Sequence, residues 1–184
     1  SVYALNAQSG QSQWTARLGG PVRSSPRVLQ DVMYVGSDDQ SIYALDPRRG
    51  DQLWSYRTWG PVRSSAALAG GSLFFGSDDG HVYALEARRG EQQWKTRTGQ
   101  AVISSPLPWE GLILVGSWDS FVYALDQRSG WPAWKYRTNG RVTSSPFVYG
   151  NRLYIGSADG TFYCLDARNG KLVWKFESGG FITS

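Results

Sequence analysis

The sequence contains one cysteine (Cys164), one histidine (His81) and one methionine (Met33) among 184 residues. A single cysteine excludes an internal disulfide framework and any metal site built from several cysteines. No apolar run approaches the roughly 18 residues that a membrane-spanning helix needs, so we expect no transmembrane segment. The chain begins with serine and carries no signal-peptide pattern, from which we expect a processed product or a fragment.

Charge is also scarce, whereas aromatic residues are abundant. Charged residues make up 18% of the chain, below the quarter typical of globular domains, and the formal net charge is only +4. The chain holds nine Trp, ten Tyr and seven Phe. So many aromatic side chains need burial, which excludes a disordered chain and favours a folded domain.

The sequence repeats itself every 40 residues without an insertion or deletion. A Gly-Ser pair recurs in four units, and a tyrosine is followed two residues later by leucine in five. Tryptophan and glycine recur at fixed positions of each unit: Trp14, Trp54, Trp94, Trp134 and Trp174, and Gly10, Gly50, Gly90, Gly130 and Gly170. A repeat of this length indicates stacked supersecondary units rather than an ordinary single domain.

Each unit is predicted to form four short strands, exemplified by residues 62–68, 72–75, 81–85 and 93–98. Asp79-Gly80 lies between two apolar runs, which is a strong hairpin signal. No stretch of ten residues has helical periodicity. The predicted fold is therefore all-β: a β-propeller of four-stranded antiparallel blades, with about 4.6 repeats present.

The segment from Ala44 to Trp54 resembles the tryptophan-docking repeat of quinoprotein-type (pyrroloquinoline-quinone-like) β-propellers. The Val-x-Ser-Ser-Pro segments at 22–26, 102–106 and 142–146 and the hairpin at 153–160 match the same repeat, so the resemblance covers the whole chain. The family often has threonine where this chain has Ser9, Arg49, Arg89, Ser129 and Asn169.

The repeat predicts complete blades at 22–58, 62–98, 102–138 and 142–178. Residues 1–18 supply two outer strands, and residues 181–184 begin another inner strand. Propellers of this class usually have seven or eight blades, or about 280 to 320 residues at this period. We therefore expect about half of a ring, completed by the rest of a longer chain or by a second copy.

The recurrent tryptophans and glycines are interpreted as structural. Each Trp would fill the gap between adjacent sheets, and each Gly would permit a turn that a Cβ disfavours. A functional site that occurs once in the molecule would not require the same residue in all five units.

Functional residues are expected where the repeat is broken, on the face shared by the hairpins and the connections between blades. We predict a protein or peptide partner there, contacted by Trp59, Arg63, Trp118, Asp119, Arg23 and Asn139. Arg23 and Arg63 would point at an anionic group in the channel, and an exposed Trp118 would act as an anchor. The alternative is that Trp59 and Trp118 only cap the channel or pack on neighbouring blades.

Arginines in the turns on the opposite face, at 48–49, 88–89, 128 and 168, form a second basic feature. Carboxylates lie within a few residues of each, so we expect local ion pairs and no nucleic-acid binding.

The resemblance also implies a catalytic alternative: a fragment of a quinoprotein dehydrogenase that binds pyrroloquinoline quinone and calcium. Here one cysteine replaces the vicinal pair found in many of those enzymes, and the carboxylates recur in turns without converging. His81 lies in a hairpin, so no nucleophile–base pair can be assembled. We therefore predict no enzymatic activity, catalytic residue, metal site or cofactor, but an assembly or sensing scaffold. The resemblance alone places it in an extracytoplasmic compartment.

Overall fold

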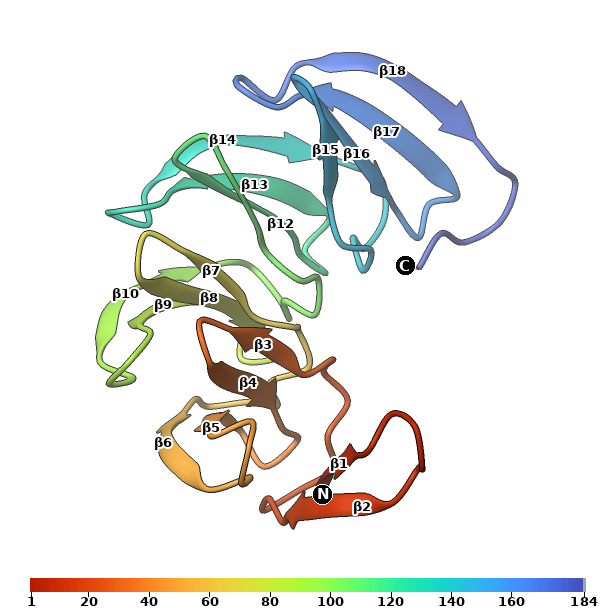
Figure 1. The fold of residues 1–184 in the computed structure, drawn as a ribbon. Coiled ribbons are helices and arrows are strands. Elements are labelled where there is room, and N and C mark those ends of the chain that lie inside the picture. The colour runs from red at the N-terminus through yellow and green to blue at the C-terminus, as the bar shows by residue number, and fades with distance from the viewer. Residues whose placement is uncertain (184) are drawn as a thin grey trace.

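The computed structural model describes residues 1–183, which form five antiparallel sheets that follow one another along an arc (Figure 1). The first sheet has two strands and the other four have four strands each. The strands are β1 (Val2–Leu5) and β2 (Ser12–Ala16); β3 (Arg27–Leu29), β4 (Val32–Gly36), β5 (Ser41–Leu45) and β6 (Gln52–Arg57); β7 (Ala67–Ala69), β8 (Ser72–Ser77), β9 (His81–Glu86) and β10 (Gln92–Arg97); β11 (Leu107–Trp109), β12 (Leu112–Gly116), β13 (Phe121–Asp126) and β14 (Pro132–Arg137); β15 (Phe147–Tyr149), β16 (Arg152–Gly156), β17 (Thr161–Asp166) and β18 (Leu172–Glu177).

The predicted fold class is confirmed: the described residues are all-β, and each four-stranded sheet is a propeller blade. Strands within a blade pair with their sequence neighbours, because short hairpin turns join them. None of residues 1–183 belongs to a helix that is long and apolar enough to cross a membrane. Residues 181–183 are not in a strand, and Ser184, the last residue of the predicted inner strand, lies outside the described residues.

The hydrophobic core lies between the blades. Tyr34 and Ile42 of one blade pack with Leu73 and Tyr83 of the next in one buried cluster. Equivalent clusters fill the next two gaps. Since each blade is stabilised by its neighbours, a blade with no neighbour exposes one apolar face.

The innermost strand begins later than the sequence predicts. We expected a strand over 62–68, but β7 begins at Ala67. The Val62 N–H donates to the carbonyl of Ser37 in the preceding blade (3.0 Å). The Ser64 hydroxyl accepts from the Gly76 N–H at 2.7 Å and donates to its carbonyl at 3.0 Å. Residues 62–66 therefore satisfy their hydrogen bonds with the preceding blade and through the Ser64 side chain, and they do not form a strand ladder.

Serine side chains also connect the inner segments of successive blades. The Ser25 N–H donates to the Ser65 hydroxyl (2.9 Å), Ser65 to Ser105 (3.0 Å), and Ser105 to Ser145 (3.0 Å). The two serines of the repeated Ser-Ser pair therefore have different roles. The hydroxyl of the first bonds the inner segment to the second strand of its own blade, and the hydroxyl of the second accepts a hydrogen bond from the preceding blade.

Tryptophan side chains dock each blade onto the following one. The indole N–H of Trp54 donates to the carbonyl of Ala87 (3.1 Å), and its ring lies against Gly90. A Cβ on Gly90 would lie only 2.7 Å from ring atom Cε3 of Trp54. Trp14, Trp94 and Trp134 repeat this contact with the carbonyls of Pro47, Gln127 and Ala167 and with Gly50, Gly130 and Gly170.

Candidate partner-binding face

The hairpins between second and third strands and the connections between blades lie on one face, which we call the hairpin face. It comprises the hairpins at 37–40, 77–80, 117–120 and 157–160 and the connections at 58–61, 98–101 and 138–141. The connection after β6 joins two hairpins: the Thr58 N–H donates to the carbonyl of Gln40 (2.7 Å), and the Trp59 N–H donates to the Asp79 carboxylate (3.0 Å). The backbone of this face is thus fixed by the repeat, while its variable side chains project from it.

Asp119 has a structural role on this face. Its carboxylate accepts hydrogen bonds from the Tyr123 hydroxyl (2.7 Å), the Gly99 N–H (2.6 Å) and the Phe121 N–H (3.0 Å). Burial raises the pKa of Tyr123, and the bond to Asp119 raises it further. Tyrosine–aspartate bonds recur in the other hairpins at Asp39, Asp79 and Asp159. Since both Asp119 oxygens are engaged within the chain, little of this carboxylate remains for a partner.

Asn139 occupies the connection after β14. Its backbone N–H donates to the Asp159 carboxylate (2.8 Å), as Trp59 does to Asp79 two blades earlier. Its side chain is exposed. The backbone of Asn139 is therefore part of the repeat, and only its amide side chain is free on the hairpin face.

Arg23 and Arg63 pair with carboxylates of the chain itself instead of presenting their charges to an external anion. Arg23 contacts Asp38 (2.7 Å), while Arg63 contacts both Asp38 (3.1 Å) and Asp78 (2.8 Å). The 40-residue spacing places Arg63 between the hairpins of two blades, where it bridges them. The first aspartates of the Asp38-Asp39 and Asp78-Asp79 hairpins therefore lie beside these arginines, an arrangement that the sequence did not predict.

The two aspartates of this chain of ion pairs have opposite pKa shifts. Burial tends to raise the pKa of Asp38, but hydrogen bonds from Arg23 and Arg63, with their charges, hold it below the ordinary value. Burial raises the pKa of Asp78; the charge of Arg63 opposes this shift, and those of Asp38 and Asp79 add to it. The fold therefore favours the ionised form of Asp38 and disfavours the ionised form of Asp78.

Asp38→Asn and Asp78→Asn are expected to change stability with opposite pH dependence. Asp38 contributes stability above its unfolded pKa, and this contribution is lost as the pH falls through its lower folded pKa. Asp38→Asn should thus cost about 1 kcal/mol at neutral pH and progressively less in acid. The contribution of Asp78 to the folding stability falls as the pH rises through its raised folded pKa. The Asp78→Asn variant should therefore become more stable relative to the wild-type chain as the pH rises. Urea unfolding between pH 3 and pH 7 measures both, and parallel pH profiles would contradict the assignment.

Trp59 is the most exposed tryptophan among residues 1–183, at 83%. It borders a hollow of about 600 Å³ lined also by Gln40, Tyr56, Arg57 and Thr58. An aromatic side chain held on a bonded backbone beside an open hollow has the character of a binding anchor.

Trp118 is not the exposed anchor that the sequence predicts. Its side chain is only partly exposed, and the Arg141 guanidinium lies over its ring, 4.8 Å from the centroid. Its indole N–H is buried and makes no hydrogen bond with any described residue. The ring of Trp118 is thus covered by Arg141, which lies in the connection after β14.

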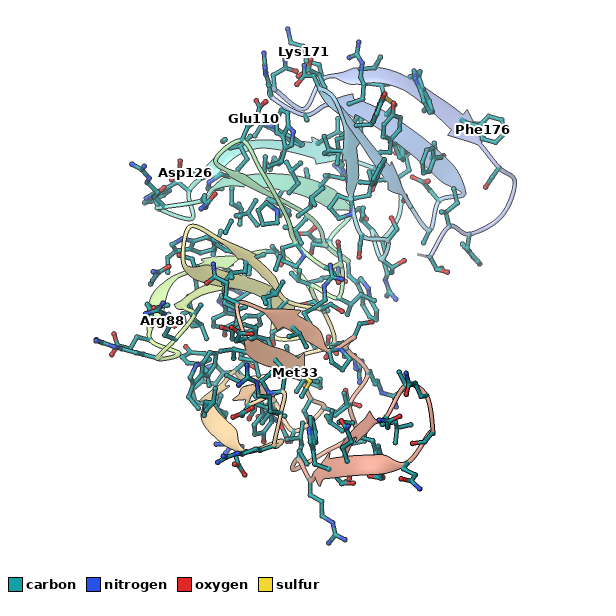
Figure 2. The ribbon with its side chains drawn as sticks, viewed as in Figure 1. Met33, Arg88, Glu110, Asp126, Lys171 and Phe176 are labelled. Carbon is teal, nitrogen blue, oxygen red and sulfur yellow. The ribbon has the colours of Figure 1, made fainter. Side chains whose placement is uncertain are left out.

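On the opposite face, the turns at 46–50, 86–90, 126–130 and 166–170 place exposed arginines away from the hairpin face, and Figure 2 shows Arg88 and Asp126 projecting outward. We expected ion pairs with carboxylates a few residues away, which is wrong for these arginines: within residues 1–183 only Arg168 has an ion pair, and its partner is Glu110 of the preceding blade, at 3.5 Å. The carboxylates instead accept backbone N–H groups, as Asp46 does from Arg48 (2.7 Å). Trp131, 76% exposed, lies at the end of one of these turns.

The described residues contain no group of three or more His, Cys, Asp or Glu side chains that could hold a metal ion. Cys164 is buried, which raises the pKa of its thiol. His81 contacts only one carboxylate, that of Asp79 (3.2 Å), within its own hairpin. A calcium ion takes six to eight oxygen ligands, and residues 1–183 by themselves bring no three such carboxylates together.

A protein-family profile described as outer membrane protein assembly factor BamB matches residues 1–66 and 58–178. The chain belongs to this family of PQQ-like repeat propellers. No curated protein matches the chain. The family profile thus covers the same repeats whose docking tryptophans and glycines are described above.

Solved structures share the fold at low identity. BamB from Moraxella catarrhalis is 22% identical with a TM-score of 0.80, and the match covers 91% of this chain and 53% of that one. A quinohemoprotein alcohol dehydrogenase from Pseudomonas putida is 20% identical with a TM-score of 0.80 over 92% of this chain and 36% of that one. A computationally designed protein is 16% identical with a TM-score of 0.84 over 95% and 55%. The chain thus spans about half the length of that BamB and about a third of the dehydrogenase.

Proposed function

We propose that this chain is a non-catalytic scaffold that binds a polypeptide partner on its hairpin face, with Trp59 as the anchor. The observation that carries the proposal is the exposed Trp59 ring beside an open hollow, on a backbone fixed by bonds to two hairpins. A rigid platform with a projecting aromatic side chain loses little conformational entropy on binding. Asn139, exposed two blades later, provides a polar contact on the same face.

The family supports a role in assembly, because its profile is described as an outer membrane protein assembly factor. We propose an extracytoplasmic location on the same basis. The quinone-dependent alternative is less well supported, since the described residues lack a calcium ligand cluster. Saturable quenching of tryptophan fluorescence by pyrroloquinoline quinone with calcium, accompanied by reduction of a dye acceptor, would favour that alternative.

Peptide selection tests the proposed face. Random peptides displayed on phage are selected on the wild-type chain, and the enriched peptides are measured against Trp59→Ala and Trp131→Ala. Both tryptophans are largely exposed, at 83% and 76%, but lie on opposite faces, so Trp131→Ala is a matched control. We expect Trp59→Ala to weaken binding at least tenfold, the usual loss at an aromatic hot spot, while Trp131→Ala leaves it unchanged. Equal affinity for wild type and Trp59→Ala would refute the anchor.

A further inference from the structure

A polar hollow lies between the blade β7–β10 and the blade β11–β14, on the side opposite the hairpin face. It has a volume of about 460 Å³ and is lined by Gly70, Ser72, Gln93, Gln127 and Arg128. Both blades have all four of their strands, and they lie in the middle of the arc (Figure 1). Both walls of the polar hollow are therefore present in the structure.

Three of the lining positions are polar only in this gap between blades. Their counterparts one repeat earlier and one repeat later are all apolar: Val32 and Leu112 for Ser72, Leu53 and Ala133 for Gln93, and Ala87 and Ala167 for Gln127. The neighbouring gaps show that the packing of blades is satisfied by apolar side chains here. Since polar groups are costly to bury without partners, three of them in one gap indicate another purpose.

Arg128 lacks the carboxylate that pairs with its counterpart. One gap later, Arg168 contacts Glu110 of the preceding blade at 3.5 Å. Gly70 occupies the position of Glu110 in the polar hollow. Arg128 is exposed and forms no ion pair within residues 1–183. The polar hollow thus has the cation of that contact, and a glycine where the carboxylate would begin.

The other lining groups add hydrogen-bond donors. The Ser72 hydroxyl donates to the side-chain carbonyl of Gln93 at 2.6 Å, which directs the remaining capacity of this amide to its NH₂ group. A Cβ on Gly70 would lie 2.9 Å from the side-chain nitrogen of Gln127, so the second amide also reaches the hollow. Arg128 is the only charged residue among the five that line it. Such a donor-rich lining favours a ligand that accepts hydrogen bonds and carries negative charge.

We propose that the polar hollow binds a small organic acid, whose carboxylate pairs with Arg128 as Glu110 pairs with Arg168. Hydroxyl or carbonyl oxygens of the same ligand accept hydrogen bonds from the amides of Gln93 and Gln127. An arginine guanidinium matches the geometry of a carboxylate, and the volume lies within the range of small-molecule sites. The proposal does not depend on the peptide-binding role of the hairpin face, which lies on the opposite side.

Titration followed by ¹H–¹⁵N NMR tests this site. The probes are D-glucuronate, which has a carboxylate and several hydroxyls, acetate, which has the carboxylate alone, and D-glucose, which lacks it. Gln93→Leu and Gln127→Ala, which take the residues found one repeat earlier, assign the two side-chain amide resonances. We expect glucuronate to shift these resonances saturably and to bind more tightly than acetate, whereas glucose leaves them unchanged.

Arg128→Gln and Gly70→Glu should each weaken glucuronate binding at least about tenfold, because the first removes the cation and the second gives it an internal partner. Glutamate is compatible with the turn: Gly70 has a φ of +58°, and Glu110 itself has a φ of +44°. The only atom that the new Cβ would meet is the mobile end of the Gln127 side chain.

Two matched controls accompany these variants. Gly70→Gln adds the same bulk without charge and should bind glucuronate more tightly than Gly70→Glu. Arg88→Gln removes the equivalent arginine from the preceding gap, where the lining is apolar, and should bind like wild type. Equal binding by Arg128→Gln and wild type would overturn the proposal, as would glucose binding as well as glucuronate. A lack of saturable shifts up to about 50 mM glucuronate would also overturn it.

Discussion

Trp94→Ala is expected to lower the free energy of unfolding by about 3 to 5 kcal/mol, the usual cost of truncating a buried tryptophan. Trp94 is 8% exposed, its indole N–H donates to the carbonyl of Gln127 (3.0 Å), and its ring lies against Gly130. Removing the ring opens a cavity between two blades and leaves that carbonyl without its bond. Urea unfolding followed by circular dichroism measures the loss.

Trp174→Ala is the matched control, because Trp174 has the same position in its repeat but makes no equivalent docking contact within residues 1–183. Its side chain is already 45% exposed. We expect a loss of about 1 kcal/mol or less in the monomer, since little buried area is removed. Comparable losses in the two variants would show that the tryptophans stabilise their own blades and not the contact with the next one.

Gly90→Ala is expected to cost about 3 kcal/mol. Gly90 has a φ of +73°, where a residue with a Cβ pays about 1 to 2 kcal/mol. The added Cβ would also lie 2.7 Å from the Trp54 ring, so the ring or the turn must shift. Overpacking of this kind costs a further 1 to 3 kcal/mol. The same urea unfolding experiment measures the effect.

Gly111→Ala isolates the backbone part of that cost. Gly111 has a φ of +80° but no atom within 4 Å of its ideal Cβ position. We expect a loss of about 1 kcal/mol, from the backbone conformation alone. An equal loss at Gly90 and Gly111 would mean that the packed tryptophan adds nothing to the requirement for glycine.

The 40-residue period and the hairpin signals were sufficient to predict an all-β propeller with four-stranded blades. Both depend on local geometry: Asp-Gly turns and alternating side chains favour hairpins wherever they occur. The inner Val-x-Ser-Ser segment was predicted incorrectly because its bonding partners, such as Ser37 and Ser65, lie in neighbouring blades. The sequence of one 40-residue unit does not distinguish such a segment from a strand.

Breaks in the repeat were sufficient to locate the candidate face, but they did not predict which of its side chains are exposed and which are paired. Trp59 and Trp118 are both breaks, yet one is exposed and the other lies under Arg141. Arg23 and Arg63 looked available to an anion until the fold placed Asp38 and Asp78 beside them. These differences depend on what neighbouring blades place next to each position.

The sequence by itself determined the repeat, the strands and their turns, because these follow from the order of residues within one unit. The tertiary structure alone decided which charges are paired and that Trp59 is exposed while Trp118 lies under Arg141. The reason is physical: these side chains lie beside neighbouring blades, so their exposure and their ion pairs depend on which residues of those blades are next to them. Arg63, for example, bridges Asp38 and Asp78 of two successive blades, a contact that no single unit contains.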